Sequence, residues 1–423
     1  MLDLKKVCER ALQEGVGPGE RAWAWRLLLG VIPASGEAGA VEASLKASRL
    51  RYEKLRREHL PDISSSCEEA GDPLTMALGA ESGWSRFYAS ADLRAEIQKD
   101  LDRLVISGLP EDHFSRSSFW ASMLTVLTVW STAHPDIGYR QGMHEILALV
   151  VLALEDEIAY GCGPAEGDDE ADCFSLFEAI MVRHADHFHA GPEAPVVAAC
   201  RTAQAELLEL YEPRLARRLN DYVEPQIYGL RWARLLFSRE FEAPASLTLC
   251  DALFAAAVGD GDPLAFRRTL QIFFVALLLV CAPRLMAATD EMECLSVLMR
   301  PQQCSVLDVV SLARRLIEAQ SQTRLANDTI VASVDDRGLP HFTTPLFGGE
   351  GGGNADDDSA NGSPRAPAVI SANDDDDDDD DEALANGLDS ALGVLSKYAN
   401  TPEAVAALDK IKFVADRLRV ASV

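Results

Sequence analysis

The sequence predicts an all-α protein. Apolar residues recur at helical spacing through most of the first 320 residues, and Gly or Pro separates the periodic segments. No stretch shows the sustained alternation of apolar and polar residues that is typical of a half-buried strand. The chain has 423 residues and is 48% hydrophobic, which is enough for one large domain or two ordinary ones.

The expected helices follow in chain order. Residues 2–14 form a separate amphipathic N-terminal helix, because glycines interrupt the pattern from residue 15 to residue 19. Within residues 15–320, which form the main domain, further helices are expected at 21–30, 41–60, 84–103, 117–134, 142–155, 173–187, 196–219, 226–239, 246–257, 264–282, 290–298 and 308–324.

One apolar run lies within these helices, and two polar segments connect them. The most apolar run, residues 272–282, is too short to span a bilayer, which needs about 20 residues, so a buried core helix is expected. Residues 62–82 and 155–172 are polar or acidic and contain glycine, so they are expected to be loops.

The composition changes at about residue 321. Residues 321–383 are polar, then Gly-rich, then poly-Asp, and such a segment buries too little apolar surface to offset its ordering entropy. A disordered acidic linker is therefore expected, either as a spacer or as an interaction element. Residues 384–423 return to helical periodicity and predict amphipathic helices. These helices could dock on the main domain as a hairpin or bind a partner as a coil.

Charge and cysteine content exclude several classes of protein. The net charge of −28 does not suit binding to a nucleic-acid backbone. Nine cysteines without a C-x-x-C pair predict free thiols in a reducing compartment. The N-terminus is charged and leads into no apolar signal region. We therefore expect a cytoplasmic protein that meets membranes only peripherally.

Familiar catalytic and metal motifs do not occur. The sequence contains no Gly-Lys dipeptide, so no nucleotide-binding loop of the Walker type is present. His144 and Glu145 begin like a zinc-protease motif, but Ala148 stands at the position of the second ligand. The histidines at 184, 187 and 189 are better explained by a solvated helix end than by a metal site.

One candidate for chemistry ends the helix expected at residues 84–103. Ile97, Asp100 and Arg103 recur every three residues and therefore share one helix face. Asp100 is placed to pair with the Arg103 guanidinium and to hold it extended. By spacing alone, an ordinary surface ion pair explains these residues better than a functional site does.

A second candidate lies between two helices. Gln141 stands in the string GYRQG at residues 138–142, where the flanking glycines allow sharp turns and close approach of another molecule. A glutamine amide donates and accepts hydrogen bonds at once, which is what the positioning of a water molecule requires. A capping loop with a polar residue facing water explains the string equally well.

Three motifs stand in one order along the chain. They are Arg21-x-x-x-Trp25 followed by Leu-Leu-Gly and Pro33, then Ile97-x-x-Asp100-x-x-Arg103, then Tyr139-x-Gln141-Gly142-Met143. With residues 227–241 and 251–254, they resemble the TBC domain, the all-helical GTPase-activating domain that acts on Rab GTPases. The resemblance covers about residues 15–320.

The string GYRQGMHEILA at residues 138–148 is similar to one branch of that family. Its animal members associate with retromer and autophagosomes, and it also occurs in plants and protists. Residues 49–60 and the loop at 72–75 fit the same branch. The resemblance implies a role in endosomal vesicle traffic, with retromer or autophagy components as further partners and Pro73-Leu74 as a docking point.

The resemblance also implies roles for single residues. Arg103 is expected to act as an arginine finger on the β- and γ-phosphates, and Gln141 to orient the attacking water. Asp100, Tyr139 and Gly142 would support these two fingers, and Arg21 and Trp25 would support the finger helix from behind. The chain would need no nucleotide or metal of its own, because GTP and Mg²⁺ arrive with the partner GTPase. It would be an activator rather than an enzyme with its own active site.

The chain departs from the family pattern after Arg103. Relatives place Thr directly after the arginine and then Phe-Pro-Glu, whereas here Leu104 follows and extra residues precede Pro110 and Glu111. A longer loop that contains Gly108 is expected to hold Arg103 less firmly. For that reason a catalytically weak TBC fold that binds a Rab or a coat complex is the alternative function.

Overall fold

The computed structural model describes residues 3–60, 83–162, 168–189, 191, 194–258, 264–301 and 304–332. These residues form helices and no strand, which confirms the all-α prediction. The elements are α1 (Leu4–Ala11), α2 (Arg21–Leu28), α3 (Ala38–His59), α5 (Gly83–Leu101), α6 (His113–Arg116), α7 (Trp120–Ala133), α8 (Met143–Ala159), α9 (Asp169–His184), η1 (Ala185–Phe188), α10 (Pro195–Arg201), η2 (Thr202–Leu207), α11 (Leu208–Tyr211), α12 (Pro213–Tyr222), α13 (Pro225–Arg234), α14 (Ala243–Ala256), α15 (Ala265–Ala287), α16 (Glu291–Met299) and α17 (Val306–Ala332).

Local sequence accounts for many helix ends. Asp3 begins α1 and Asp290 begins α16, and in each case the carboxylate accepts a hydrogen bond from a backbone N–H of the first turn. Proline stands in the first turn of α10, α12, α13 and α14, where its missing N–H leaves no helical bond unmade. Gly30 follows α2 with a φ of +73°, which ends that helix.

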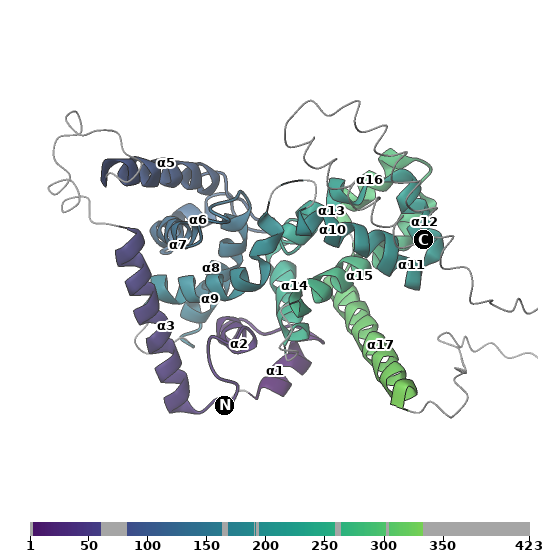
Figure 1. Cartoon of the computed structure of the whole chain (residues 1–423), viewed down its shortest axis with the longest axis horizontal. Helices are drawn as coiled ribbons and strands as arrows, with labels where there is room; N and C mark the ends of the chain where they lie inside the picture. Colours follow the sequence, from purple (N-terminus) through teal and green to yellow (C-terminus); the bar gives the residue numbers. More distant parts are fainter. Residues whose placement is uncertain are drawn as a thin grey trace, which may run out of the picture. The chain divides into compact units, whose positions relative to one another are not determined.

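The helix α8 lies at the centre of the N-terminal half of the described residues. It contacts α2, α5, α7, α9 and α14, and Figure 1 shows α7 and α9 beside it. Its side chains from Met143 to Leu154 are all buried. A helix that is apolar on every side is stable in water only when other elements cover it completely. The helix after the Gln141 loop is therefore fixed in the core.

The helix α15 is the core of the C-terminal half. Within the described ranges it is the one helix that is long and apolar enough to cross a membrane. It packs against α17, α14, α16 and η2, and most of its side chains are buried in the protein. This arrangement confirms the prediction that residues 272–282 belong to a buried core helix.

The helix α3 is fixed to α9 by polar contacts. Arg49 forms two hydrogen bonds with Asp172, of 2.9 and 2.8 Å. The hydroxyl of Tyr52, which is buried, donates to Glu170 over 2.7 Å, and Arg56 lies 3.1 Å from the same carboxylate. The basic face of α3 thus matches the acidic first turns of α9.

Three predicted segments differ from the structure. The single helix expected at residues 196–219 is divided by the π-helical turn η2 and by Pro213, which ends α11. The helix expected at 226–239 ends at Arg234, because Leu236 and Phe237 adopt a positive φ. The linker boundary at residue 321 falls inside α17, which continues to Ala332.

Three predicted segments lie outside the described residues. They are the remainder of the acidic linker (333–383), the helices expected at 384–423, and the loop with Pro73-Leu74. The eight cysteines that the structure describes are free thiols, which agrees with the prediction.

Candidate functional site

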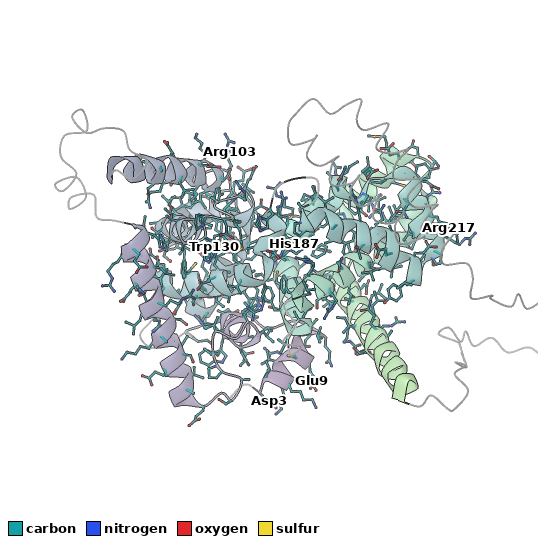
Figure 2. The ribbon with its side chains drawn as sticks, in the orientation of Figure 1. Asp3, Glu9, Arg103, Trp130, His187 and Arg217 are labelled. Atoms are coloured by element: carbon teal, nitrogen blue, oxygen red, sulfur yellow. The ribbon has the colours of Figure 1, made fainter. Side chains whose placement is uncertain are left out.

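Arg103 lies directly after the end of α5. Ile97 and Leu101 are buried and fix this end of the helix to the core. The backbone N–H of Arg103 donates to the carbonyl of Asp100 over 3.2 Å, which closes a turn after the helix. The Arg103 side chain is exposed, and Figure 2 shows it at the end of α5 on the outside of the ribbon. The end of α5 is thus fixed to the core, and the Arg103 guanidinium that follows it is exposed to solvent.

Gln141 lies in the loop between α7 and α8. The N–H of Gly138 donates to the carbonyl of His134 over 2.8 Å, which turns the chain at the end of α7. Gly142 has a φ of +104°, and a Cβ atom added there would lie 2.6 Å from Leu235 Cδ2. Only glycine fits this position, both sterically and by conformation. The Gln141 side chain is exposed immediately before the buried start of α8.

A partly buried hydrogen bond joins the two motifs. The hydroxyl of Tyr139 donates to Asp100 Oδ2 over 2.8 Å. Burial raises the pKa of Tyr139 and the bond to Asp100 raises it further, so the phenol remains a donor. Tyr139 precedes Gln141 by two residues and Asp100 precedes Arg103 by three, so this bond links the loops that carry the two exposed side chains.

The predicted ion pair between Asp100 and Arg103 is wrong. Within the described residues the Asp100 carboxylate pairs with Tyr139, and the Arg103 side chain has no polar partner. The physical reason is that the buried phenol offers Asp100 a partly buried hydrogen bond, whereas a pair with an exposed arginine gains little in water. Asp100 supports the site by holding the two loops together rather than by extending Arg103.

His144 completes this buried network. Its Nδ1 atom lies 3.0 Å from the Tyr139 hydroxyl, 3.4 Å from the Gly142 nitrogen and 3.9 Å from Asp100 Oδ2. Burial lowers the pKa of His144, against the opposing effect of Glu145 and Asp100. Sequence reasoning considered His144 only as an incomplete metal motif. Because His144 stands three residues after Gln141, its position in the sequence could have indicated that it contacts the Gln141 loop.

The loop after Arg103 is packed against the domain. Leu104 and Ile106 are buried, and the carbonyl of Ser107 accepts a hydrogen bond of 2.8 Å from the N–H of Ala243. Gly108 has a φ of +85° and lies against Glu242. The expectation that this longer loop is loosely held is therefore wrong, because two apolar side chains and a backbone bond fix it to the start of α14.

Arg21 and Trp25 converge on a buried carboxylate. Arg21 Nε lies 3.1 Å from Asp251 Oδ1, and the indole N–H of Trp25 donates to the same oxygen over 2.7 Å. Burial raises the pKa of Asp251, and Arg21 opposes this rise. Arg21 also bonds Asp156 near the end of α8, over 3.2 Å. These contacts tie α2 to α14 and to the C-terminal end of α8. The expected support of the finger helix α5 by Arg21 and Trp25 stays a prediction.

A second ion pair fixes the first turn of α8. The buried carboxylate of Glu145 accepts hydrogen bonds of 2.8 and 2.5 Å from Nε and Nη2 of Arg239. Arg239 follows the turn that contains Leu236 and Phe237, so the strained turn and the start of α8 are held together. Sequence reasoning did not find this pair, because its members are separated by 94 positions.

No group of three or more His, Cys, Asp or Glu side chains in the described part of the chain is arranged to hold a metal ion. His184 and His187 instead stack with ring centroids 4.5 Å apart in the core. Both are buried, which corrects the prediction of a solvated helix end. Figure 2 labels His187 among the central helices.

Comparison with known proteins finds similar sequences. Residues 82–286 match the family model described as the Rab-GTPase-TBC domain. The chain is 27% identical to human TBC1 domain family member 5 over 321 residues, which cover 66% of this chain and 39% of that protein. It is 30% identical to TBC1 domain family member 5 homolog B of Dictyostelium discoideum over 185 residues, which cover 41% of this chain and 18% of that protein.

The fold also matches a solved structure. The crystal structure of the Ypt/Rab-GAP domain of Gyp1p superposes with a TM-score of 0.57 at 17% identity, covering 76% of this chain and 94% of that domain. Residues 82–286 thus carry a match to the Rab-GTPase-TBC domain family, and the chain is similar in sequence to TBC1 domain family members and in fold to a Ypt/Rab-GAP domain. It spans less than two fifths of the length of the TBC1 domain family member 5 proteins that it matches.

Proposed function

We propose that this protein accelerates GTP hydrolysis by a Rab-family GTPase, to which it supplies Arg103 and Gln141. The observation that carries the proposal is the 2.8 Å hydrogen bond between Tyr139 and Asp100. It joins two loops that each end in an exposed side chain of the required type, a cation and an amide. The match of residues 82–286 to the Rab-GTPase-TBC domain model supports the same function.

The two side chains have complementary roles in this proposal. The Arg103 guanidinium neutralises charge that develops on the β- and γ-phosphates in the transition state. The Gln141 amide accepts a hydrogen bond from the attacking water and donates one to the phosphoryl oxygen, which positions the water for in-line attack. GTP and Mg²⁺ belong to the GTPase, and the chain contributes only the two side chains and the surface that holds them.

The proposed setting is the cytoplasmic face of endosomal membranes. The likeness to TBC1 domain family member 5 supports this setting, with retromer or autophagy components as further partners. The candidate docking point Pro73-Leu74 lies outside the described residues.

A single-turnover assay with a panel of GTP-loaded Rab GTPases tests the catalytic claim. We expect Arg103→Ala to lower the accelerated rate by about 10³-fold or more, and Gln141→Ala to lower it by about 10²-fold. Both variants should still bind the GTPase. Arg116→Ala is the matched control, because Arg116 is an exposed arginine whose ion pair, within the described residues, is with Asp112 at the start of α6.

The outcomes separate catalysis from binding. Acceleration by the wild type that Arg103→Ala abolishes, with binding retained, supports the proposal. A wild type that binds a GTP-loaded Rab without any acceleration supports instead the alternative of a Rab-binding or coat-complex adaptor, and the proposed catalytic role of Arg103 is then wrong.

A further inference from the structure

A basic pocket adjoins the two motifs. It has a volume of about 440 Å³, and its walls include Val105, Ser107, Arg231, Arg239, Met299 and Arg300. Val105 and Ser107 belong to the loop that continues from Arg103, and Glu145 of the first turn of α8 forms another part of the wall. The pocket is thus continuous with the segments that carry Arg103 and Gln141.

Two of its arginines are held in fixed orientations. Arg239 binds the buried Glu145 through Nε and Nη2, and Arg231 binds the buried Glu240 in the same way over 2.6 and 2.7 Å. In both residues Nη1 has no hydrogen-bond partner among the described residues. A guanidinium that is already oriented loses little side-chain entropy when it binds an acceptor.

The remaining part of the pocket wall offers a third arginine and two exposed apolar side chains. Arg300 is exposed at the end of α16, and its side chain makes no ion pair with any other described residue. Val105 and Met299 are 55% and 40% exposed. Three arginines against two buried glutamates leave positive charge here, although the chain as a whole carries −28. The pocket therefore suits an anionic group that has an apolar neighbour.

We propose that this basic pocket receives a surface carboxylate of the GTPase, with an adjacent apolar side chain over Val105 and Met299, and so contributes to the choice of Rab. The inference rests on the proposed function, because the pocket is joined to the finger loops and meets whatever they meet. Carboxylates and guanidiniums form bidentate hydrogen bonds, which select for a matching acidic residue.

The test compares variants on one Rab that the wild type accelerates. We expect Arg300→Glu to raise KM about tenfold at low salt while kcat changes less than about twofold, because the pocket affects binding and the fingers remain intact. The effect should decrease between about 0.05 and 0.5 M NaCl as charge is screened. Met299→Ser should raise KM about threefold.

A charge-reversal control sharpens the assignment. Arg217→Glu changes an exposed arginine of α12 that is not part of the pocket. In the described part of the chain its side chain binds the carbonyl of Pro213 on its own helix, so KM should stay within about twofold of the wild type. Restoration of KM for Arg300→Glu by one Asp→Lys or Glu→Lys substitution on the GTPase would identify the partner carboxylate.

Other outcomes overturn the inference. An unchanged KM for Arg300→Glu refutes it even when the wild type is fully active. If the wild type binds a Rab without accelerating hydrolysis, the same variants are compared by Kd. The role of the pocket in binding can then be tested although the proposed catalytic function is wrong. If Arg300→Glu abolishes sedimentation with phosphatidylserine vesicles and leaves KM unchanged, the pocket binds anionic lipid instead.

Discussion

Removal of a single hydroxyl group at Tyr139 tests how the site is held. Tyr139→Phe deletes the donor to Asp100, which lies 2.8 Å away, while the ring keeps its place in the core. A hydrogen bond to a charged group contributes about 1.5–3 kcal/mol. Because the Asp100 side chain retains 17% exposure, water can partly replace the phenol, so we expect a loss of about 1.5–2 kcal/mol in the free energy of unfolding.

The effect on GTP hydrolysis should be larger than this stability change suggests. The bond fixes the distance between the loops of Arg103 and Gln141, and misplacement of a catalytic group by about 1 Å costs about 10² in rate. We expect kcat to fall between about 10-fold and 100-fold with KM nearly unchanged, as measured in a stopped-flow phosphate-release assay with a GTP-loaded Rab.

Tyr52→Phe provides the matched control. Tyr52 is also buried, and its hydroxyl donates to Glu170 over 2.7 Å, but this bond joins α3 to α9. Its loss should lower stability by a similar amount and leave kcat unchanged. If Tyr139→Phe retains full kcat, or if Tyr52→Phe loses as much kcat, the hydrogen bond to Asp100 does not position the fingers.

Two further predictions concern stability. In a urea titration, Gly142→Ala should lower the free energy of unfolding by about 2–4 kcal/mol, because it combines a positive φ with a Cβ contact of 2.6 Å to Leu235. At Gly138 φ is also positive, but no atom lies within 4 Å of an added Cβ. Gly138→Ala should therefore lower the free energy of unfolding by only about 1 kcal/mol. Burial lowers the pKa of His184 to about 4 and also lowers that of His187. The two imidazoles therefore bind protons more tightly in the unfolded chain than in the folded one. The stability that the neutral rings allow above about pH 6.5 is lost as the pH falls towards 4. For His184 this loss amounts to up to about 3 kcal/mol in the free energy of unfolding. His187→Phe should flatten this decline without loss of stability at pH 7.5, because neither ring nitrogen of His187 has a hydrogen-bond partner among the described residues. An unchanged slope between pH 7 and 5 would contradict the role of His187 in this decline.

The outcome at Asp100 shows where sequence reasoning failed. The spacing of three residues correctly placed Asp100 in the last turn of a helix, but Arg103 lies in the turn that follows Leu101, the last residue of α5. A regular spacing also does not show which partner a carboxylate prefers. The competing donor, Tyr139, lies 39 positions further along the chain and is brought to Asp100 only by the packing of α5 against α7 and α8.

The loop after Arg103 shows the same limit. The length of this loop and its glycine predicted weak contacts with the domain. In the structure Leu104 and Ile106 are buried, and the carbonyl of Ser107 accepts a hydrogen bond from the N–H of Ala243. Likewise the pair of Glu145 and Arg239 has no local signal, because nothing in the sequence near either residue specifies the other.

The sequence by itself determined the all-α class, most helix positions, and the presence of an arginine and a glutamine at the ends of structured segments. These features depend on interactions between residues up to about four positions apart, which periodicity and capping residues record. Only the tertiary structure decided that Tyr139 and Asp100 join the two loops and that Arg231, Arg239 and Arg300 form a pocket beside them. Such contacts depend on how distant helices pack, and the physical chemistry of each partner then decides which polar groups pair.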